Sequence, residues 1–215
     1  MFDKARYIVV EGPIGAGKTS LARRLAEYLP ATQPMFEQSQ DNPFLARFYQ
    51  DPGRWALATQ LSFFFQRLGQ LAALERDGLD GNERIVSDFM FERDALFARL
   101  TLSKEELILY ERVHAAARPV ALPVPDLVIY LQAPTATLME RIHQRGIDAE
   151  RRMPESYVER IARRYAHFFF QYETAPLFIV DATVLNPVDN EDDFRLLIER
   201  IAEMRGYREF FGYAA

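Results

Sequence analysis

Cysteine is absent from the 215 residues of this chain, so it can form neither a disulfide nor a catalytic thiolate. Long apolar runs are also missing: the longest stretch without a charged residue covers 127–139, short of the roughly 18 residues of a membrane-spanning helix. Residues 1–6 lack the pattern of a signal peptide. These absences favour a soluble cytoplasmic protein without a membrane partner.

Positive charge is in deficit as well, with 26 Lys and Arg against 31 Asp and Glu and a net charge of −5. Nucleic acids and anionic membranes bind basic surfaces, so we expect no nucleic-acid partner. Lysine is confined to Lys4, Lys18 and Lys104, which makes Lys18 stand out. At about 150 residues per domain, residues 1–215 are expected to form a single domain.

Short apolar runs alternate with longer segments of helical period, the pattern of a parallel sheet with crossover helices. The predicted strands cover residues 7–10, 34–36, 84–88, 127–131 and 177–180. The predicted helices cover residues 18–29, 52–77, 103–117, 135–145, 154–172 and 191–205. Gly78 and Gly81 should end the long second helix, and Ser103 with Glu106 forms a capping box. We therefore predict an α/β fold with a five-stranded parallel sheet and helices on both faces.

A glycine-rich motif lies directly between the first predicted strand and the first predicted helix. Residues 12–19 read GPIGAGKT and match G-x-x-x-x-G-K-[ST]. Glycines let successive N–H groups point inward beside the positive end of the helix, which makes a cup for phosphates. The predicted nucleotide-binding residues are Gly12, Gly15, Ala16, Gly17, Lys18, Thr19 and Ser20.

In this motif Lys18 would neutralise the β- and γ-phosphates, and Thr19 would offer its hydroxyl to Mg²⁺. The alternative is an ordinary glycine-rich turn. Because strand, motif and helix follow in the required order, we predict a P-loop NTPase fold that binds a nucleoside triphosphate with Mg²⁺.

Two carboxylates are expected near this cup. Glu37 follows the second predicted strand and Asp88 ends the third, and the carboxyl ends of parallel strands share one edge of the sheet. One carboxylate could position or deprotonate an attacking hydroxyl, and the other could hold Mg²⁺ or its water. Each could instead be a solvated carboxylate at a strand end.

Arg141 and Arg145 lie four residues apart, on one face of a predicted helix that ends at a glycine. We expect them to begin a lid, at about residues 141–153, that closes over a transferring phosphoryl group. A solvated, arginine-rich surface helix is the alternative.

With these motifs identified, the sequence resembles the deoxynucleoside kinase family, P-loop kinases that phosphorylate the 5′-hydroxyl of deoxynucleosides. The resemblance spans about residues 7–205 and rests on the segments VEGPIGAGKTSLARRLAEYL, FYQDPGRWALATQ and LMERIHQRGIDAE. It implies a phosphoryl donor such as ATP, a deoxynucleoside acceptor and a homodimer. It also implies that Glu37 is the general base and that Arg141 and Arg145 are the lid arginines.

The resemblance implies acceptor-binding residues too. Gln60 corresponds to the glutamine that holds the base edge, and Arg67 and Asp94 to the pair beside the base. Tyr49 and Glu150 correspond to the residues that hold the sugar 3′-hydroxyl. Gln60 and Arg67 are seven residues apart, about two helical turns, so they share a face. From the residues alone, Gln60 and Arg67 could equally border a core stripe.

One departure concerns the arginine that family members carry after the acidic residue of the third strand. Here Asp88 is followed by Phe89 and Met90. Our hypothesis is that Arg93 restores the charge if a helix begins at this point. In the lid, Ile147 stands where many relatives carry another arginine. The aromatic residue that stacks on the base is left open between Phe97 and Phe64.

The favoured function is transfer of the γ-phosphoryl group of ATP to a deoxynucleoside, with Mg²⁺ held through Thr19 and Asp88. A nucleoside monophosphate kinase of the thymidylate kinase kind is the rival enzyme. A carboxylate base would repel its dianionic acceptor, so Glu37 argues for a neutral hydroxyl. A nucleotide-binding module without catalysis is the third candidate, kept open by Phe89. Purine and pyrimidine acceptors both stay open, because the Gln60 amide can turn.

Overall fold

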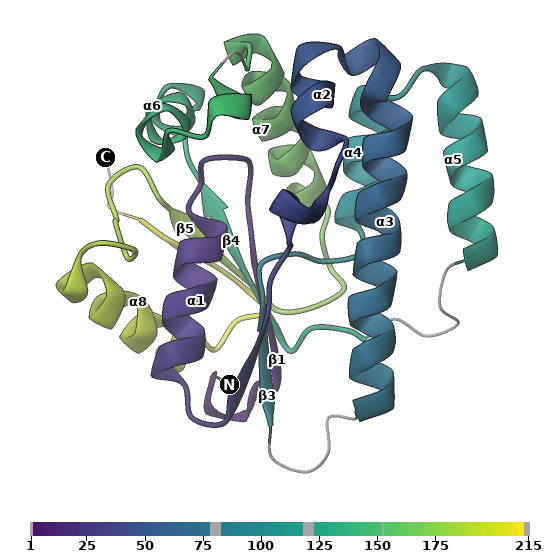
Figure 1. Cartoon of the computed structure of the whole chain (residues 1–215). Helices are drawn as coiled ribbons and strands as arrows, with labels where there is room; N and C mark the ends of the chain where they lie inside the picture. The colour runs from purple at the N-terminus through teal and green to yellow at the C-terminus, as the bar shows by residue number, and fades with distance from the viewer. Residues whose placement is uncertain (1, 78–82, 118–122, 152, 213–215) are drawn as a thin grey trace.

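The computed structural model describes residues 2–77, 83–117, 123–151 and 153–212, and a parallel sheet runs through its centre (Figure 1). Among these residues the sheet has six strands in the order β2-β3-β1-β4-β5-β6. The strands are β1 (Tyr7–Glu11), β2 (Thr32–Met35), β3 (Arg84–Ser87), β4 (Leu127–Gln132), β5 (Leu177–Asp181) and β6 (Arg208–Phe211). The first strand is central, with Ile8 paired to both Val86 and Leu127. The predicted α/β fold is confirmed.

The sixth strand corrects the prediction of five. β6 pairs in parallel with β5 at the edge of the sheet, with Arg208 opposite Leu177. Phe211 packs against the core, whereas Phe210 is 62% exposed. An edge strand is held on one side only and does not bury a full face, so this short segment carries little of the apolar pattern that identifies a central strand.

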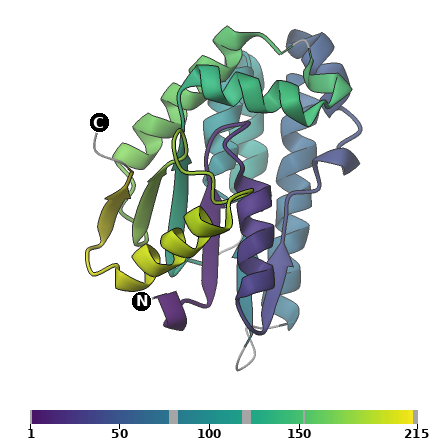
Figure 2. The same ribbon diagram turned by 90° about the vertical axis from the view of Figure 1, so that its left-hand side faces the viewer.

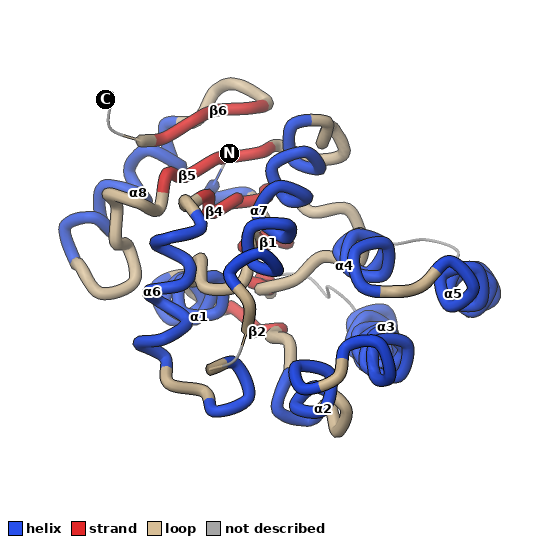
Figure 3. Tube along the Cα trace, turned by 90° about the horizontal axis from the view of Figure 1, so that it is seen from above, coloured by secondary structure: helices blue, strands red, loops and turns tan. Residues whose placement is uncertain are grey.

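Helices lie on both faces of the sheet, as predicted (Figure 3). One face is covered by α1 (Lys18–Tyr28) and α8 (Glu191–Glu203), and the other by α3 (Pro52–Asp77), α4 (Arg93–Thr101) and α7 (Glu155–Phe170); α5 (Lys104–Ala117) packs outside α3 and α4. Successive side chains of β1 point to opposite faces of the sheet, so they pack in two separate hydrophobic cores. Ile8 and Val10 pack in the cluster that includes Leu21 of α1, and Tyr7 and Val9 pack in the other cluster.

The remaining helices lie at the carboxyl ends of the strands. They are α2 (Leu45–Gln50) and α6 (Thr135–Arg145), and α6 crosses the top of the molecule in Figure 2. Short 3-10 helices cover Phe2–Lys4, Ser39–Asp41 and Asp148–Glu150. No helix in the described ranges is long and apolar enough to cross a membrane.

Most predicted elements agree with the structure, and the long helix has the predicted bounds. The capping box forms, because the Ser103 N–H donates to Glu106 Oε2 at 2.9 Å and the Glu106 N–H donates to Ser103 Oγ at 3.3 Å. The helix α2 was not predicted, because it is six residues long and buries only Phe48. Helix α4 was not among the predicted helices either, and only the hypothesis on Arg93 included a helix that begins at this point. The predicted stops at Gly78 and Gly81 lie outside the described residues.

Gly69 lies inside α3, where a Cβ would have no heavy atom within 4 Å. Alanine has a higher helix propensity than glycine by about 1 kcal/mol, so Gly69→Ala should raise the free energy of unfolding by about that amount in urea titrations. Gly15→Ala is the contrasting variant, because its Cβ would lie 2.6 Å from the Leu138 carbonyl oxygen at a φ of +84°. We expect it to lower stability. A loss of stability in Gly69→Ala would contradict the first expectation.

Candidate active site

The loop between β1 and α1 forms the phosphate cup that the motif predicts. Gly15 and Gly17 have φ angles of 84° and 94°, in the left-handed region that favours glycine. Across the loop, Lys18 Nζ donates a hydrogen bond to the Pro13 carbonyl oxygen at 3.0 Å. The N-terminus of α1 and the Lys18 ammonium group are therefore positioned to hold an anion.

A cavity of about 520 Å³ lies beside this loop, at the carboxyl ends of the strands. The cavity is lined by residues that the sequence predicted for the site, and they come from the P-loop, helices α2 and α3, the lid and the loops after β2 and β3. Those that line it are Gly15, Ala16, Gly17, Lys18, Thr19, Ser20, Glu37, Tyr49, Gln60, Arg67, Asp88, Arg141, Arg145 and Glu150. Gly12 and Asp94 are absent from the lining, and Asp94 is fully buried.

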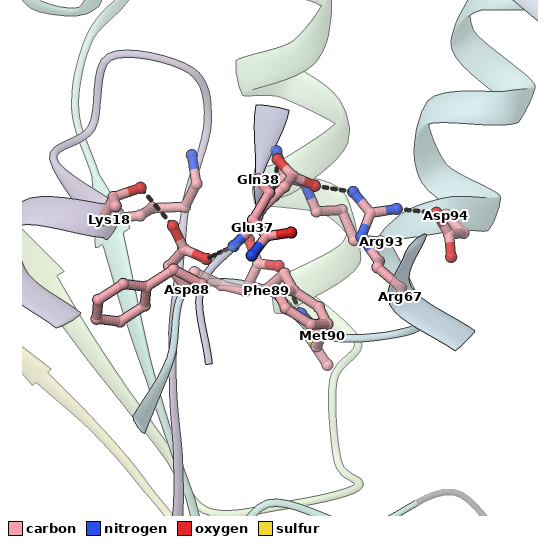
Figure 4. A network of polar contacts seen from close by, with 12 residues as sticks. Lys18, Glu37, Gln38, Arg67, Asp88, Phe89, Met90, Arg93 and Asp94 are labelled. Atoms are coloured by element: carbon pink, nitrogen blue, oxygen red, sulfur yellow. Dashed lines mark hydrogen bonds and ion pairs between the residues drawn. The ribbon is translucent and has the colours of Figure 1, made fainter. Parts of the chain in front are cut away.

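Asp88 connects the P-loop to the segment that carries Glu37. Its Oδ2 accepts a hydrogen bond from the Thr19 hydroxyl, and its Oδ1 accepts one from the Glu37 backbone N–H at 2.7 Å (Figure 4). A hydroxyl and a carboxylate are the oxygen ligands that Mg²⁺ prefers. In the described parts of the chain, no cluster of three or more His, Cys, Asp or Glu residues could enclose a metal ion. Thr19 and Asp88 are the residues here whose oxygens would hold a Mg²⁺ ion together with phosphates.

The Glu37 carboxylate lies between two arginines (Figure 4). Oε1 accepts a hydrogen bond from Arg67, and Oε2 lies 3.2 Å from Arg93 Nη1. Burial by itself would raise the pKa of Glu37, but Arg93 and then Arg67 outweigh it and hold that pKa at about 2. Glu37 is thus a carboxylate at every pH at which the protein would be assayed.

Helix α3 also fixes the backbone on both sides of Glu37. Gln70 donates to the Phe36 carbonyl oxygen at 2.8 Å, and Gln66 donates to the Gln38 carbonyl oxygen at 3.0 Å. Neither glutamine was among the residues predicted from the sequence. The four-residue spacing of Gln66 and Gln70 on one helical face is a signal, but it does not identify backbone carbonyls as their partners.

Arg67 joins two carboxylates. Besides Glu37 it pairs with Asp94, and the two side chains of this second pair are 3% and 0% exposed. Burial raises the pKa of Asp94 to about 6, although Arg67 opposes the shift. Asp94 is therefore placed to orient the Arg67 guanidinium from behind, whereas Arg67 itself faces the cavity.

The positions of Phe89 and Arg93 agree with the hypothesis that Arg93 supplies the positive charge missing at position 89. Phe89 is 0% exposed and belongs to the apolar core, so position 89 supplies no charge to the cavity. Arg93 is the first residue of α4 and lines the cavity beside Glu37. Phe97 also lines the cavity, and the Arg93 guanidinium lies 5.1 Å from its ring centre. Phe64, the other candidate for base stacking, is buried in the core.

The predicted lid residues form two groups. Arg145 Nη2 donates to Glu150 Oε2 at 2.5 Å, and Glu150 is 8% exposed. Tyr49 lies near this pair: burial raises the pKa of Tyr49, and Tyr157 and Glu150 add to the shift. In contrast, Arg141 Nη2 donates to the Ala182 carbonyl oxygen at 2.6 Å, after β5.

The first part of the predicted lid is helical, because α6 continues to Arg145 and ends at Gly146 with a φ of 68°. Ile147 is 43% exposed and does not line the cavity. Residue 152 of the predicted lid lies outside the described residues.

A buried carboxylate that sequence reasoning missed lies at the end of β1. Glu11 is 0% exposed and accepts hydrogen bonds from the Gly12 N–H at 3.1 Å, the Met90 N–H at 3.0 Å and the Tyr165 hydroxyl at 3.2 Å. Burial raises the pKa of Glu11. This residue therefore ties the start of the P-loop to α7 and to the loop before Arg93. An acidic residue at the end of an apolar strand was the signal available in the sequence.

The chain is similar to a family of known proteins. The sequence model of the family described as "Deoxynucleoside kinase" matches residues 8–204. The chain is 30% identical over 207 residues to a deoxyguanosine kinase of Bacillus subtilis strain 168, covering 94% of this chain and 99% of that protein. It is 27% identical over 208 residues to a deoxyadenosine/deoxycytidine kinase of the same strain, covering 94% of each chain.

A solved structure is also similar. The deoxyadenosine kinase from M. mycoides, with the products dCMP and a flexible dCDP bound, superimposes with a TM-score of 0.78 and 25% sequence identity. The match covers 92% of this chain and 99% of that chain.

The P-loop lysine gives a pH-dependent prediction. Burial, and then the nearby Arg93, lower the pKa of Lys18 from 10.5 to about 8. The protonated form attracts a triphosphate, so the affinity for Mg²⁺–ATP should fall as pH rises through about 8 and should change little just below it. Titration calorimetry between about pH 7 and pH 9.5 measures this change.

Lys18→Arg is the matched control, because the arginine stays charged across this range and should remove the pH dependence whatever its absolute affinity. An unchanged affinity of the natural protein up to about pH 9.5 would contradict the prediction.

Proposed function

The chain belongs to the deoxynucleoside kinase family, and on that premise we propose that its cavity transfers the γ-phosphoryl group of ATP to the 5′-hydroxyl of a deoxynucleoside. The observation that carries the proposed mechanism is the position of Glu37. This ionised carboxylate faces the same cavity as the phosphate cup and is held between Arg67 and Arg93. A neutral hydroxyl can approach it as a hydrogen-bond donor.

Glu37 acts in this proposal mainly by orientation. A carboxylate with a pKa of about 2 is a weak base, so it does not ionise the hydroxyl before attack. It accepts the hydroxyl hydrogen bond, aligns the oxygen with the γ-phosphorus, and receives the proton late, as the new O–P bond forms. In a loose phosphoryl-transfer transition state the new O–P bond is only weakly formed, so a base that positions the hydroxyl is sufficient.

The positive groups act on the phosphates. Lys18 lies in the phosphate cup, and Arg145, with its side chain 46% exposed, can approach from the lid. Arg93 supplies the guanidinium beside the reacting hydroxyl. Thr19 and Asp88 would hold Mg²⁺, which when bound neutralises charge on the β- and γ-phosphates. Arg141 bonds to the segment after β5, so we assign it to the donor side of the cavity.

The acceptor occupies the side of the cavity lined by α2, α3 and α4. Gln60 is 4% exposed and offers both a donor and an acceptor to a base edge. Phe97 supplies a stacking surface. Tyr49 and Glu150, which are held near each other, bind the sugar 3′-hydroxyl in this proposal.

The two other candidate functions are less well supported. A monophosphate acceptor would bring a dianion to Glu37, which would repel it. A module without catalysis was suggested by Phe89, but the structure supplies a guanidinium from Arg93 instead. The names of the similar proteins also favour a deoxynucleoside acceptor.

A homodimer, a cytoplasmic location and a single domain over residues 1–215 stay predictions. They are supported by family resemblance, by the absence of cysteine and by chain length.

Phosphoryl transfer from Mg²⁺–ATP is the direct test of the function. Each of the four deoxynucleosides and the four deoxynucleoside monophosphates is tested alone in a coupled assay for ADP. We expect turnover with at least one deoxynucleoside and none above background with the monophosphates. Turnover with monophosphates alone would move the assignment to the rival kinase. ATP binding without turnover on any acceptor would favour the module without catalysis.

Arg93→Ala tests the replacement guanidinium. Loss of a charged donor beside the reacting oxygen should lower kcat by about 100-fold or more, and ATP affinity should change little because the phosphate cup is intact. Arg93→Lys should recover only part of the rate, because an ammonium group lacks the planar fork of arginine. The matched control is Arg99→Ala, an exposed position on the same helix, which should keep normal turnover. Near-normal kcat in Arg93→Ala would refute this role.

A further inference from the structure

The loop between β5 and α8 is compact and borders the cavity. Leu185 to Asp189 line it, and a Cβ on Gly17 would lie 3.4 Å from the Val188 side chain. Within the loop, the Asn190 N–H donates to the Asn186 carbonyl oxygen at 3.0 Å, and the Asn186 side chain donates to Asp189 at 3.1 Å. This loop therefore lies directly against the phosphate cup.

In the proposed function, the base of the donor nucleotide would lie against this loop. The phosphates occupy the P-loop, and the acceptor hydroxyl must lie beside Glu37, on the side of α3 and α4. The donor nucleoside then extends toward the other side of the P-loop. That side of the cavity is lined by Arg141, by Ala182 and by the segment from Leu185 to Asp189.

Arg24 of α1 attaches this loop from outside the cavity. Its Nη1 donates to the carbonyl oxygens of Pro187 at 3.1 Å, Val188 at 3.0 Å and Asn190 at 3.3 Å. Its Nη2 pairs with Glu191, at the start of α8. Its guanidinium also lies 4.2 Å from the centre of the Phe194 ring. Arg24 does not line the cavity.

These contacts fix the orientation of the peptide groups in the loop. In a trans peptide the carbonyl and the N–H point in opposite directions, so holding the Pro187 carbonyl toward α1 turns the Val188 N–H away from α1. Arginine suits this task because its rigid fork can hold several acceptors at once. The ion pair with Glu191 and the contact with the Phe194 ring keep the guanidinium in place.

We propose that Arg24 is a positioning residue for the donor nucleotide base, acting through the backbone of the 186–190 loop. The proposal rests on the proposed function, because it takes a nucleoside triphosphate as the donor. Loss of Arg24 would release the loop that contacts the base and leave the phosphate cup unchanged. The effect should therefore fall on ligands that carry a base.

The first experiment compares two probes by titration calorimetry, both with Mg²⁺. One is a non-hydrolysable ATP analogue, and the other is inorganic tripolyphosphate, which has no base. Arg24→Gln should weaken binding of the ATP analogue by about tenfold and leave tripolyphosphate affinity within about twofold. The matched control is Arg23→Gln, the neighbouring exposed arginine on α1, which should leave both affinities unchanged.

Kinetics give the second measurement. At saturating deoxynucleoside, Arg24→Gln should raise KM for ATP and narrow the discrimination between ATP and GTP, whereas KM for the deoxynucleoside and kcat at saturating ATP should change little. Arg24→Lys should lie between Arg24→Gln and the natural protein, because lysine keeps the charge and loses the fork. It also provides the comparison if Arg24→Gln does not fold.

Equal weakening of both probes, or no weakening of either, would overturn the proposal, because a merely structural role would not separate them. The binding experiment does not depend on the acceptor. If the natural protein binds the ATP analogue but phosphorylates no deoxynucleoside, the proposed function fails and the role of Arg24 is still decided by the two probes.

Discussion

The carboxylate of Glu37 is buried, and its ion pairs with Arg67 and Arg93 are the interaction on which the geometry of the cavity depends. A buried charge without partners would be neutralised or moved into water. The arrangement extends beyond these three residues, because Arg67 also pairs with Asp94. In the proposed function, an incoming triphosphate adds negative charge beside these buried ion pairs, so that charge must be met by Lys18, the lid arginines and Mg²⁺.

The position of Arg93 at the start of a helix is electrostatically unfavourable. Cations are disfavoured at a helix N-terminus, because the helix dipole places partial positive charge there. Arg93 is nevertheless the first residue of α4, and Asp94 follows it in the first turn. Its attraction to Glu37, and the acidic neighbour, offset the unfavourable position. The guanidinium beside Glu37 therefore comes from the first residue of α4. Phe89, which follows β3, packs its apolar side chain in the core.

Local patterns in the sequence predicted the elements that are determined by a short motif or by the spacing of their own apolar residues. The P-loop could be recognised because its glycines and lysine serve one ligand, and α3 could be delimited because Pro52 begins it and its apolar residues keep a helical period. The strand β6 could not be predicted, since an edge strand is held mainly by its neighbour. The same limit applies to Gln66, Gln70 and Arg24. Their partners are backbone carbonyls 28, 34 and more than 160 residues away, and a carbonyl has no signature in the sequence.

Helix α3 carries Gln60, which lines the cavity, Arg67, which pairs with Glu37, and Gln66 and Gln70, which bond to the backbone beside Glu37. In the proposed function, recognition of the acceptor base and alignment of the hydroxyl therefore depend on the same helix. A substitution that tilts or rotates this helix to admit a different base also moves the group that aligns the hydroxyl. New acceptor preferences should be easiest to obtain from side chains that face the base without shifting α3, such as Phe97 on α4, and changes inside the long helix should alter selectivity and rate together.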